Sequence, residues 1–351
     1  MSSAFWQKSQ LKLPVIQAPM AGGATTPQLV ATVSGAGGLG FLAGAMLSPE
    51  QIGEETARIR ALTDRPFGIN LFVQAPPAPA VAELEPALKL LAPWHAELGL
   101  APPSVPASFC QPFDRQFDAL LALRPAFASF TFDILDAARM QALKQAGIQV
   151  IGTATNLAEG LAWAQLGADA VCAQGREAGG HRGTFIGPQE QSLRPMLSLV
   201  YELAQNLPVP VLAAGGIMNG KDIAGAMRHG AQACLLGTAF LRCPESGISA
   251  PWKQALAAAQ SGATRLTRAF SGRMARGLDN RYMEEMAKSQ DQLPAYPVTN
   301  ALTGPLRAAA VQAGRRDLMS LWAGEGVALA RELPAAELVA QLLAEWQAAY
   351  R

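Results

Sequence analysis

The segment QGREAGGHRG, residues 174–183, contains the side chain best suited to acid–base chemistry in this chain. His181 follows two glycines there, on backbone that can adopt unusual dihedral angles beside a ligand. Histidine gains or loses a proton near neutral pH, so His181 is a candidate catalytic or substrate-binding residue. The alternative is a structural hydrogen bond within a glycine-rich loop. The other histidines have ordinary explanations, because His95 lies in a helical insertion and His229 ends a helix, where a cation is favourable.

Two glycine-containing segments could bind a phosphate group. Gly215 and Gly216 follow one apolar run, and Gly237 and Thr238 follow the next. Glycine lets backbone N–H groups approach a phosphate without interference from a Cβ, and a helix start adds a favourable dipole. The alternative is that these glycines only form tight turns. Their position and pairing favour a phosphate site.

Two amides and a methionine follow other apolar runs. Asn70 and Gln174 can each donate and accept hydrogen bonds at the edge of a heterocycle, although either could simply cap the end of a strand. Met20 could pack against a flat ring or belong to the core.

These residues need a scaffold that brings the ends of several strands together. Short, continuously apolar runs are typical of parallel strands buried on both faces, and helical patterns separate them. Eight such runs, with no GxGxxG directly following the first, predict a TIM-type (β/α)8 barrel rather than a doubly wound open sheet, with its site in the loops after the strands. The runs are residues 14–17, 38–42, 67–72, 127–132, 149–152, 170–173, 210–213 and 233–236.

Two regions depart from this repeat. Residues 74–125 form a long insertion with helical patterns at 81–91 and 114–123, which suggests an excursion over one barrel mouth. The pattern of residues 250–333 predicts a smaller helical domain that covers the face of the barrel at the carboxyl ends of the strands. The apolar stripe within residues 334–350 predicts the closing barrel helix. We therefore expect a barrel of residues 1–249 plus 334–351.

Charge and composition exclude several classes of protein. The chain has 28 Lys and Arg against 27 Asp and Glu, which argues against nucleic acid or an anionic membrane as the main partner. Residues 1–10 lack the apolar run of a signal peptide, and no run of about 18 apolar residues predicts a membrane span. The four cysteines form no CxxC pair, so we expect reduced thiols in a cytoplasmic protein and no metal site.

Taken together, the motifs resemble those of the class I nitronate monooxygenases, once called 2-nitropropane dioxygenases. The resemblance extends over nearly the whole chain, and EAGGHRG within the ordered set is its most specific part. The motifs are QAPMAGG (17–23), SGAGGLG (34–40), PFGINLF (66–72), FTF (130–132), QGREAGGHRG (174–183), AAGGI (213–217), LLGTAFL (235–241), SGRMARG (271–277) and SLWAGEG (320–326).

The resemblance implies a barrel that binds FMN without a metal and oxidises alkyl nitronates, such as propionate 3-nitronate, with O₂. It implies that His181 is the active-site histidine, either as a base toward a neutral nitroalkane or as a group that orients an anionic nitronate. Tyr296 would lie near the substrate. The implied FMN-binding residues are Met20, Asn70, Gln174, Gly179, Gly180, Gly215, Gly216, Leu235, Leu236, Gly237 and Thr238.

Three positions depart from the pattern of the family. Asn300 and Gly304 occupy the places of a second tyrosine and a lysine, and Glu325 replaces a glutamine. A lost cation and an added carboxylate would weaken the binding of a carboxylated nitronate. Two other functions remain open from the sequence: an NAD(P)H-dependent FMN reductase with the same barrel, acting on enoyl thioesters or quinones, and a binding protein that keeps only the phosphate site.

Overall fold

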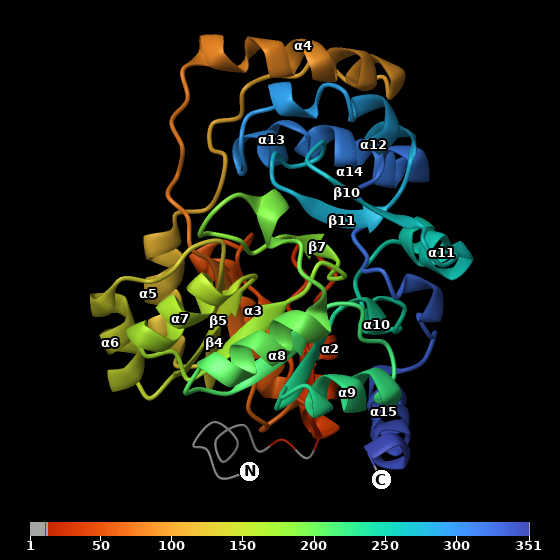
Figure 1. Cartoon of the computed structure of the whole chain (residues 1–351). Helices are drawn as coiled ribbons and strands as arrows, with labels where there is room; N and C mark the ends of the chain where they lie inside the picture. The colour runs from red at the N-terminus through yellow and green to blue at the C-terminus, as the bar shows by residue number, and fades with distance from the viewer. Residues whose placement is uncertain (1–10, 12, 351) are drawn as a thin grey trace.

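A computed structural model describes residue 11 and residues 13–350, so the expectation for residues 1–10 lies outside the described part. Eight strands pair side by side in parallel in the order β1-β9-β8-β6-β5-β4-β3-β2, and a parallel bridge from Ile16 to Leu39 joins β1 to the segment entering β2. The predicted barrel is confirmed (Figure 1). Its strands are β1 (Val15–Gln17), β2 (Phe41–Ala43), β3 (Gly68–Phe72), β4 (Phe127–Thr131), β5 (Gln149–Ala154), β6 (Ala170–Gln174), β8 (Val211–Ala214) and β9 (Ala233–Leu236).

Helices surround this barrel, and their caps explain where several of them begin. The Ser48 side chain accepts from the N–H of Gln51 while the Gln51 side chain accepts from the N–H of Ser48, a reciprocal cap that starts α3. The helix α8 buries Met196, Leu199, Val200 and Leu203, whose spacing is helical. The outer helices are α2 (Pro27–Gly35), α3 (Pro49–Leu62), α5 (Phe113–Leu123), α6 (Ala137–Gln145), α7 (Leu157–Leu166), α8 (Met196–Asn206), α9 (Gly220–Arg228) and α15 (Ala335–Tyr350).

The insertion after β3 is shorter than the sequence predicts. The helix α5 packs against α3 and β3, so it is a barrel helix and not part of the excursion. Its amphipathic face buries Phe113, Phe117 and Leu120. Only α4 (Val81–Glu97) and the segments beside it leave the barrel, and α4 extends beyond the predicted residue 91.

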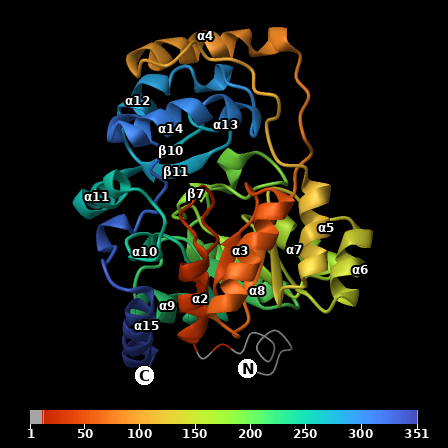
Figure 2. The same ribbon diagram turned by 180° about the vertical axis from the view of Figure 1, so that it is seen from behind.

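A second hydrophobic cluster lies above the carboxyl ends of the strands. We call residues 250–333 together with α4 the cap, because Leu84, Leu91 and Trp94 of α4 share this cluster with Tyr282 and Leu306. Figures 1 and 2 show the cap over one mouth of the barrel with α4 across its top. Its other elements are α11 (Ala250–Ala258), β10 (Thr264–Thr267), β11 (Ala275–Leu278), α12 (Arg281–Met286), η2 (Gln290–Gln292), α13 (Val298–Leu302), α14 (Gly304–Gln312), η3 (Arg316–Leu318) and η4 (Val327–Leu329).

The cap also contains strands, which the helical pattern did not predict. The antiparallel hairpin of β10 and β11 pairs with β7 (Gly180–His181), which belongs to the loop after β6. The strands escaped prediction because each is short, and Arg265 and Arg276 interrupt the apolar signal. The pairing of Ala275 with His181 fixes the candidate loop to the cap.

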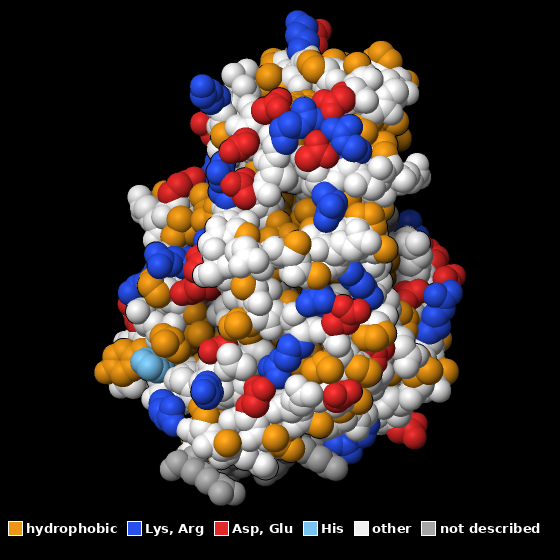
Figure 3. Space-filling view, turned by 90° about the vertical axis from the view of Figure 1, so that its right-hand side faces the viewer, with side chains coloured by type: hydrophobic (Ala, Val, Ile, Leu, Met, Phe, Trp, Pro, Cys, Tyr) orange, Lys and Arg blue, Asp and Glu red, His pale blue; other side chains and the backbone are white. Residues whose placement is uncertain are grey.

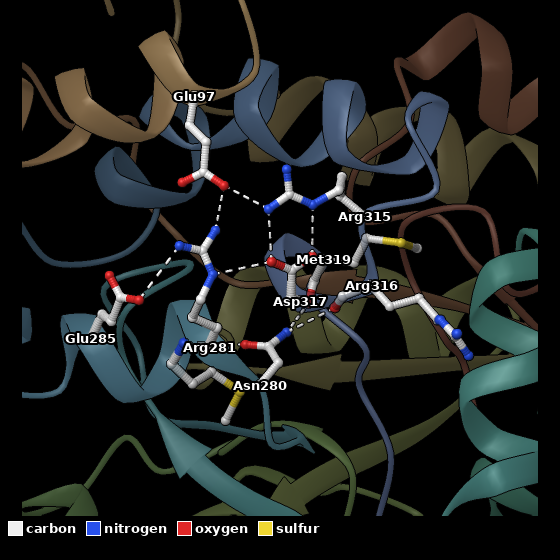
Figure 4. Close-up of polar contacts among 9 residues, drawn as sticks. Glu97, Asn280, Arg281, Glu285, Arg315, Arg316, Asp317 and Met319 are labelled. Carbon is white, nitrogen blue, oxygen red and sulfur yellow. Dashed lines mark hydrogen bonds and ion pairs between the residues drawn. The ribbon is translucent and has the colours of Figure 1, made fainter.

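An ion-pair network attaches α4 to the rest of the cap (Figure 4). Glu97 at the end of α4 pairs with Arg281 and Arg315, and both arginines pair with Asp317 at 3.1 and 2.8 Å. The hydrogen bonds from Arg315 and Arg281 hold the pKa of Glu97 below its usual value. The end of α4 is thus tied by charge to α12 and η3.

Acidic and basic side chains are interspersed over the face in Figure 3, with neither sign dominating. Within the described residues, no helix is both long and apolar enough to span a membrane. All four cysteines are free thiols, three of them buried.

Candidate active site

A cavity of about 260 Å³ lies between the barrel mouth and the cap. It is lined by the ends of the strands, by the loop that carries His181, and by cap residues including Tyr296, Arg307 and Trp322. The structure therefore brings together nearly all the residues singled out from the sequence. Those that line the cavity are Met20, Asn70, Gln174, Gly179, Gly180, His181, Gly215, Gly216, Leu235, Gly237, Thr238 and Tyr296.

Leu236 is the exception among the predicted residues. Successive side chains of a strand point to opposite faces, so Leu235 faces the barrel interior while Leu236 points outward. Leu236 is buried in the cluster between the strands and the outer helices. Only its carbonyl group acts near the cavity, by accepting a hydrogen bond from Ala18 N at 2.9 Å.

His181 sits in an aromatic cage in contact with the cap. Its ring centroid lies 5.4 Å from those of Tyr296 and Trp322 and 5.9 Å from that of Phe132. Its Nε2 lies 2.8 Å from Oγ of Ser271. Burial, together with the positive charges of Arg273 and Arg307, lowers the pKa of His181 to about 3. The imidazole is therefore neutral at physiological pH.

The loop around His181 is held by buried polar groups. The Gln174 amide donates to the carbonyl of His181 at 3.0 Å and accepts from Gly183 N at 2.8 Å. The next side chain, Arg182, is 1% exposed and donates to the carbonyls of Gly175 and Ser192. These bonds fix the backbone of His181, so Gln174 positions the loop in addition to lining the cavity.

The loops after β8 and β9 present backbone N–H groups that could hold an anion, and we call them the cradle. Gly215 and Gly216 have φ of +129° and +70°, which L side chains rarely adopt. In the described structure, neither Gly216 nor Gly237 donates its backbone N–H to another group of the chain. Unpaired N–H groups of two adjacent strand ends match the acceptor oxygens of a phosphate. The helix α10 (Thr238–Leu241) is only four residues long, so the N–H groups matter more here than a helix dipole.

Asn70 and Tyr296 present polar atoms to the same cavity. The Asn70 amide nitrogen donates to the carbonyl and the hydroxyl of Ser129. These bonds fix the orientation of the Asn70 amide and leave its oxygen without a partner in the described chain. No group of the described chain hydrogen-bonds the Tyr296 hydroxyl. Both residues can therefore contact a ligand.

Arg307, which no motif in the sequence singles out, supplies a cation to the cavity. Arg307 lies on α14 one helical turn after Gly304, so it faces the same side as the absent lysine would. It donates to the carbonyl of Asn300 at 2.7 Å and to Thr303 at 3.2 Å, and none of the described carboxylates pairs with it. The helical spacing from Gly304 was the available signal.

Glu325 does not add a negative charge to the cavity. Its carboxylate pairs with Arg276 at 2.9 Å, and its side chain is not among the groups that line the cavity. With Arg307 present and Glu325 turned to Arg276, the weakening of carboxylate binding expected from the sequence does not follow.

The nitronate monooxygenase sequence profile matches residues 2–345. The chain belongs to the nitronate monooxygenase family. Members of this family are flavin-dependent oxidoreductases, and the resemblance seen in the motifs is confirmed. A probable nitronate monooxygenase of Staphylococcus aureus strain MSSA476 is 37% identical over 347 residues, covering 96% of this chain and 97% of that protein.

Solved structures agree with membership of the nitronate monooxygenase family. A nitroalkane oxidase from Streptomyces ansochromogenes is 42% identical, with a TM-score of 0.91 over 99% of both chains. FabK from Thermotoga maritima has a TM-score of 0.77 at 24% identity, covering 99% of this chain and 97% of its own, and shares the fold. Among the residues that the structure describes, no cluster of His, Cys, Asp and Glu is arranged to hold a metal ion.

Proposed function

We propose that this nitronate monooxygenase family member oxidises alkyl nitronates of the propionate 3-nitronate type with O₂, using FMN. The observation that carries the proposal is the joint placement in one cavity of a neutral His181, the Arg307 cation and the unpaired N–H groups of Gly216 and Gly237. The imidazole would act on the reacting carbon of the substrate. The cation would bind a charged substrate tail, and the unpaired N–H groups would bind the phosphate of the cofactor.

The residues of the cavity fit FMN as follows. Gly215, Gly216, Gly237 and Thr238 would bind its phosphate. Asn70 and Gln174 would contact the edge of the isoalloxazine, with Met20 beside the ring. Bound FMN supplies the electron-accepting chemistry of the reaction. Gly179, Gly180 and Leu235 line the same cavity and would complete the walls of the flavin site.

His181 acts on the proton of the substrate. With a neutral nitroalkane, an imidazole nitrogen takes the proton from the α carbon, the C–H bond breaks, and its electron pair moves into the nitro group to give a nitronate anion. The positive charge of Arg273, which acts on the His181 ring, would favour this anion and thereby acidify the carbon. With a nitronate supplied as such, His181 would instead orient the anion.

Arg307 supports a substrate that carries a carboxylate. The Arg307 guanidinium lines the cavity with no carboxylate partner among the described residues, and a desolvated cation favours an anionic ligand. The free hydroxyl of Tyr296 can donate a second hydrogen bond. Propionate 3-nitronate has the two anionic ends that this cavity would accommodate.

The proposal is tested first by the visible spectrum and cofactor mass of the purified protein, and then by O₂ uptake with propionate 3-nitronate. We expect a yellow protein that releases FMN and consumes O₂. Bleaching of the flavin by NADH or NADPH within seconds under anaerobic conditions would instead indicate the reductase. A colourless protein that FMN does not reconstitute would indicate a binding protein.

A further inference from the structure

Ser271 makes three polar contacts at the end of the His181 ring. Its Oγ lies 2.8 Å from Nε2 of His181, donates to the carbonyl of Arg273 at 3.1 Å, and accepts from Arg273 N at 3.4 Å. Ser271 is buried, at 1% exposure, so water does not compete for these contacts. The contact with His181 Nε2 leaves open which of the two groups donates.

The hydrogen-bonding capacity of Ser271 and its neighbours indicates which group donates in the contact between Ser271 Oγ and His181 Nε2. A hydroxyl has a single proton, and a carbonyl oxygen can only accept. No other group of the described chain donates to the Arg273 carbonyl, so the Ser271 proton satisfies it. The 2.8 Å contact then requires His181 Nε2 to be the donor.

We propose that Ser271 is a positioning residue that keeps the ring proton of His181 on Nε2 and leaves Nδ1 as the bare nitrogen available to a ligand. Nδ1 has no hydrogen-bond partner in the described chain, and His181 lines the cavity. The inference rests on the proposed function for its catalytic meaning, although the position of the proton is a property of the protein alone.

This arrangement decides between the two roles open to His181. The ring is neutral, because burial lowers its pKa to about 3 and the facing charges, Arg273 and Arg307, are both positive. The remaining neighbours of the ring are Phe132, Tyr296 and Trp322. A bare Nδ1 can accept the α proton of a nitroalkane but cannot donate a hydrogen bond to a nitronate. The structure thus favours the base over the orienting group.

The position of the proton can be read directly from ¹⁵N–¹H correlation spectra of the FMN-loaded protein labelled with [¹⁵N]histidine. The chain has 3 histidines, and His181→Asn assigns the signal of interest. His95 and His229 are internal references, because Nδ1 of each lies 2.8 Å from a carbonyl and must carry the proton. We expect the ring proton of His181 on Nε2, in contrast with the Nδ1 protons of the two references. A protonated Nδ1 on His181 would overturn the proposal.

Two variants test whether Ser271 causes this state. Ser271→Ala should give a mixture of tautomers or move the proton to Nδ1, and should lower kcat/KM for a neutral nitroalkane at least about tenfold, with a smaller loss for a preformed nitronate. Ser271→Thr keeps the hydroxyl and should restore both readouts. An unchanged tautomer in Ser271→Ala would remove Ser271 from this role. If the protein does not oxidise nitronates at all, the proposed function fails while the spectra still report on the tautomer.

Discussion

The backbone of Gly324 approaches Gly179 so closely that a Cβ on Gly179 would lie 2.6 Å from the Gly324 nitrogen. Gly179 belongs to the His181 loop and Gly324 to the cap. The backbone of Gly324 is also held by Thr238, whose hydroxyl accepts from its N–H at 2.9 Å. The loop after β6, the turn after β9 and the cap therefore meet at one point beside the cavity.

Gly179→Ala should push the loop and the cap apart. A side chain forced against backbone costs about 1–3 kcal/mol, so we expect a lower melting temperature and weaker retention of the flavin. Gly225→Ala is the control, because a Cβ there meets nothing within 4 Å on α9 and alanine favours the helix. If Gly179→Ala matched Gly225→Ala in stability and colour, the close contact would have no structural importance.

His181→Asn should separate the two kinds of substrate. Removing a general base typically costs about 10²- to 10⁴-fold in rate, so turnover of nitroethane should collapse. A preformed nitronate needs no base and should lose less, and the protein should stay yellow because His181 does not hold the phosphate. The measurement is O₂ uptake with each substrate. Equal losses with both would exclude the base role.

The pH profile of kcat/KM for a nitroalkane should show no fall from protonation of His181 between pH 5 and 7. The folded-state pKa of His181 is lowered to about 3, so its neutral form is complete well below the usual value of 6.5. We expect kcat/KM for a neutral nitroalkane to be flat from pH 5 to 7. An unperturbed histidine would lose about 30-fold at pH 5. A fall of that size would show that the imidazole titrates normally in the free enzyme.

Arg307→Met should weaken the binding of carboxylated nitronates in particular. A hydrogen bond to a charged group contributes about 1.5–3 kcal/mol, so kcat/KM for propionate 3-nitronate should fall about 10- to 100-fold. Ethyl nitronate has no carboxylate and should change little. Arg307→Lys keeps the charge and should recover part of the loss. A uniform loss for both nitronates would mean that Arg307 acts only through its bonds to Asn300 and Thr303.

Glu97→Gln should loosen α4. The pair with Arg281 and Arg315 is lost, and hydrogen exchange of α4 should accelerate about two- to fivefold at low salt and less at high salt. Glu85→Gln is the control on the same helix, because the one ion pair of Glu85 among the described residues is with Lys89, at 3.7 Å. Identical exchange in both variants would contradict a fastening role for the network.

The same network should weaken in acid. The pKa of Glu97 is lowered, and that of Asp317 falls to about 2, mainly through hydrogen bonds from Arg315. Both folded-state values lie below the unfolded ones, so the stabilisation is complete above about pH 5 and is lost as the pH falls toward 2. The hydrogen-exchange rate of α4 in the wild type, divided by that in Glu97→Gln at the same pH, should therefore be higher at pH 3 than at pH 6.

The sequence predicted what depends on local pattern. The eight strands and most helix boundaries follow from apolar runs and caps such as Ser48, and the placement of Asn70, Gln174 and His181 follows from the rule that parallel strand ends share one mouth. Leu236 does not line the cavity, because the alternation of side chains along the strand turns it toward the outer helices. Arg307 and Ser271 could not be found from apolar runs. The packing of the cap brings Arg307 to the cavity and Ser271 to His181, and that packing depends on contacts distant in sequence.

The helix α15 packs between α9 and α2, yet it follows the whole of residues 250–333 in the chain. During synthesis on the ribosome, the ring of outer helices therefore stays open along the seam between α9 and α2 until the intervening segment has emerged. Leu338 and Leu342 fill that seam once α15 is made. A nascent chain stalled before α15 would expose this apolar seam and become a target for chaperones.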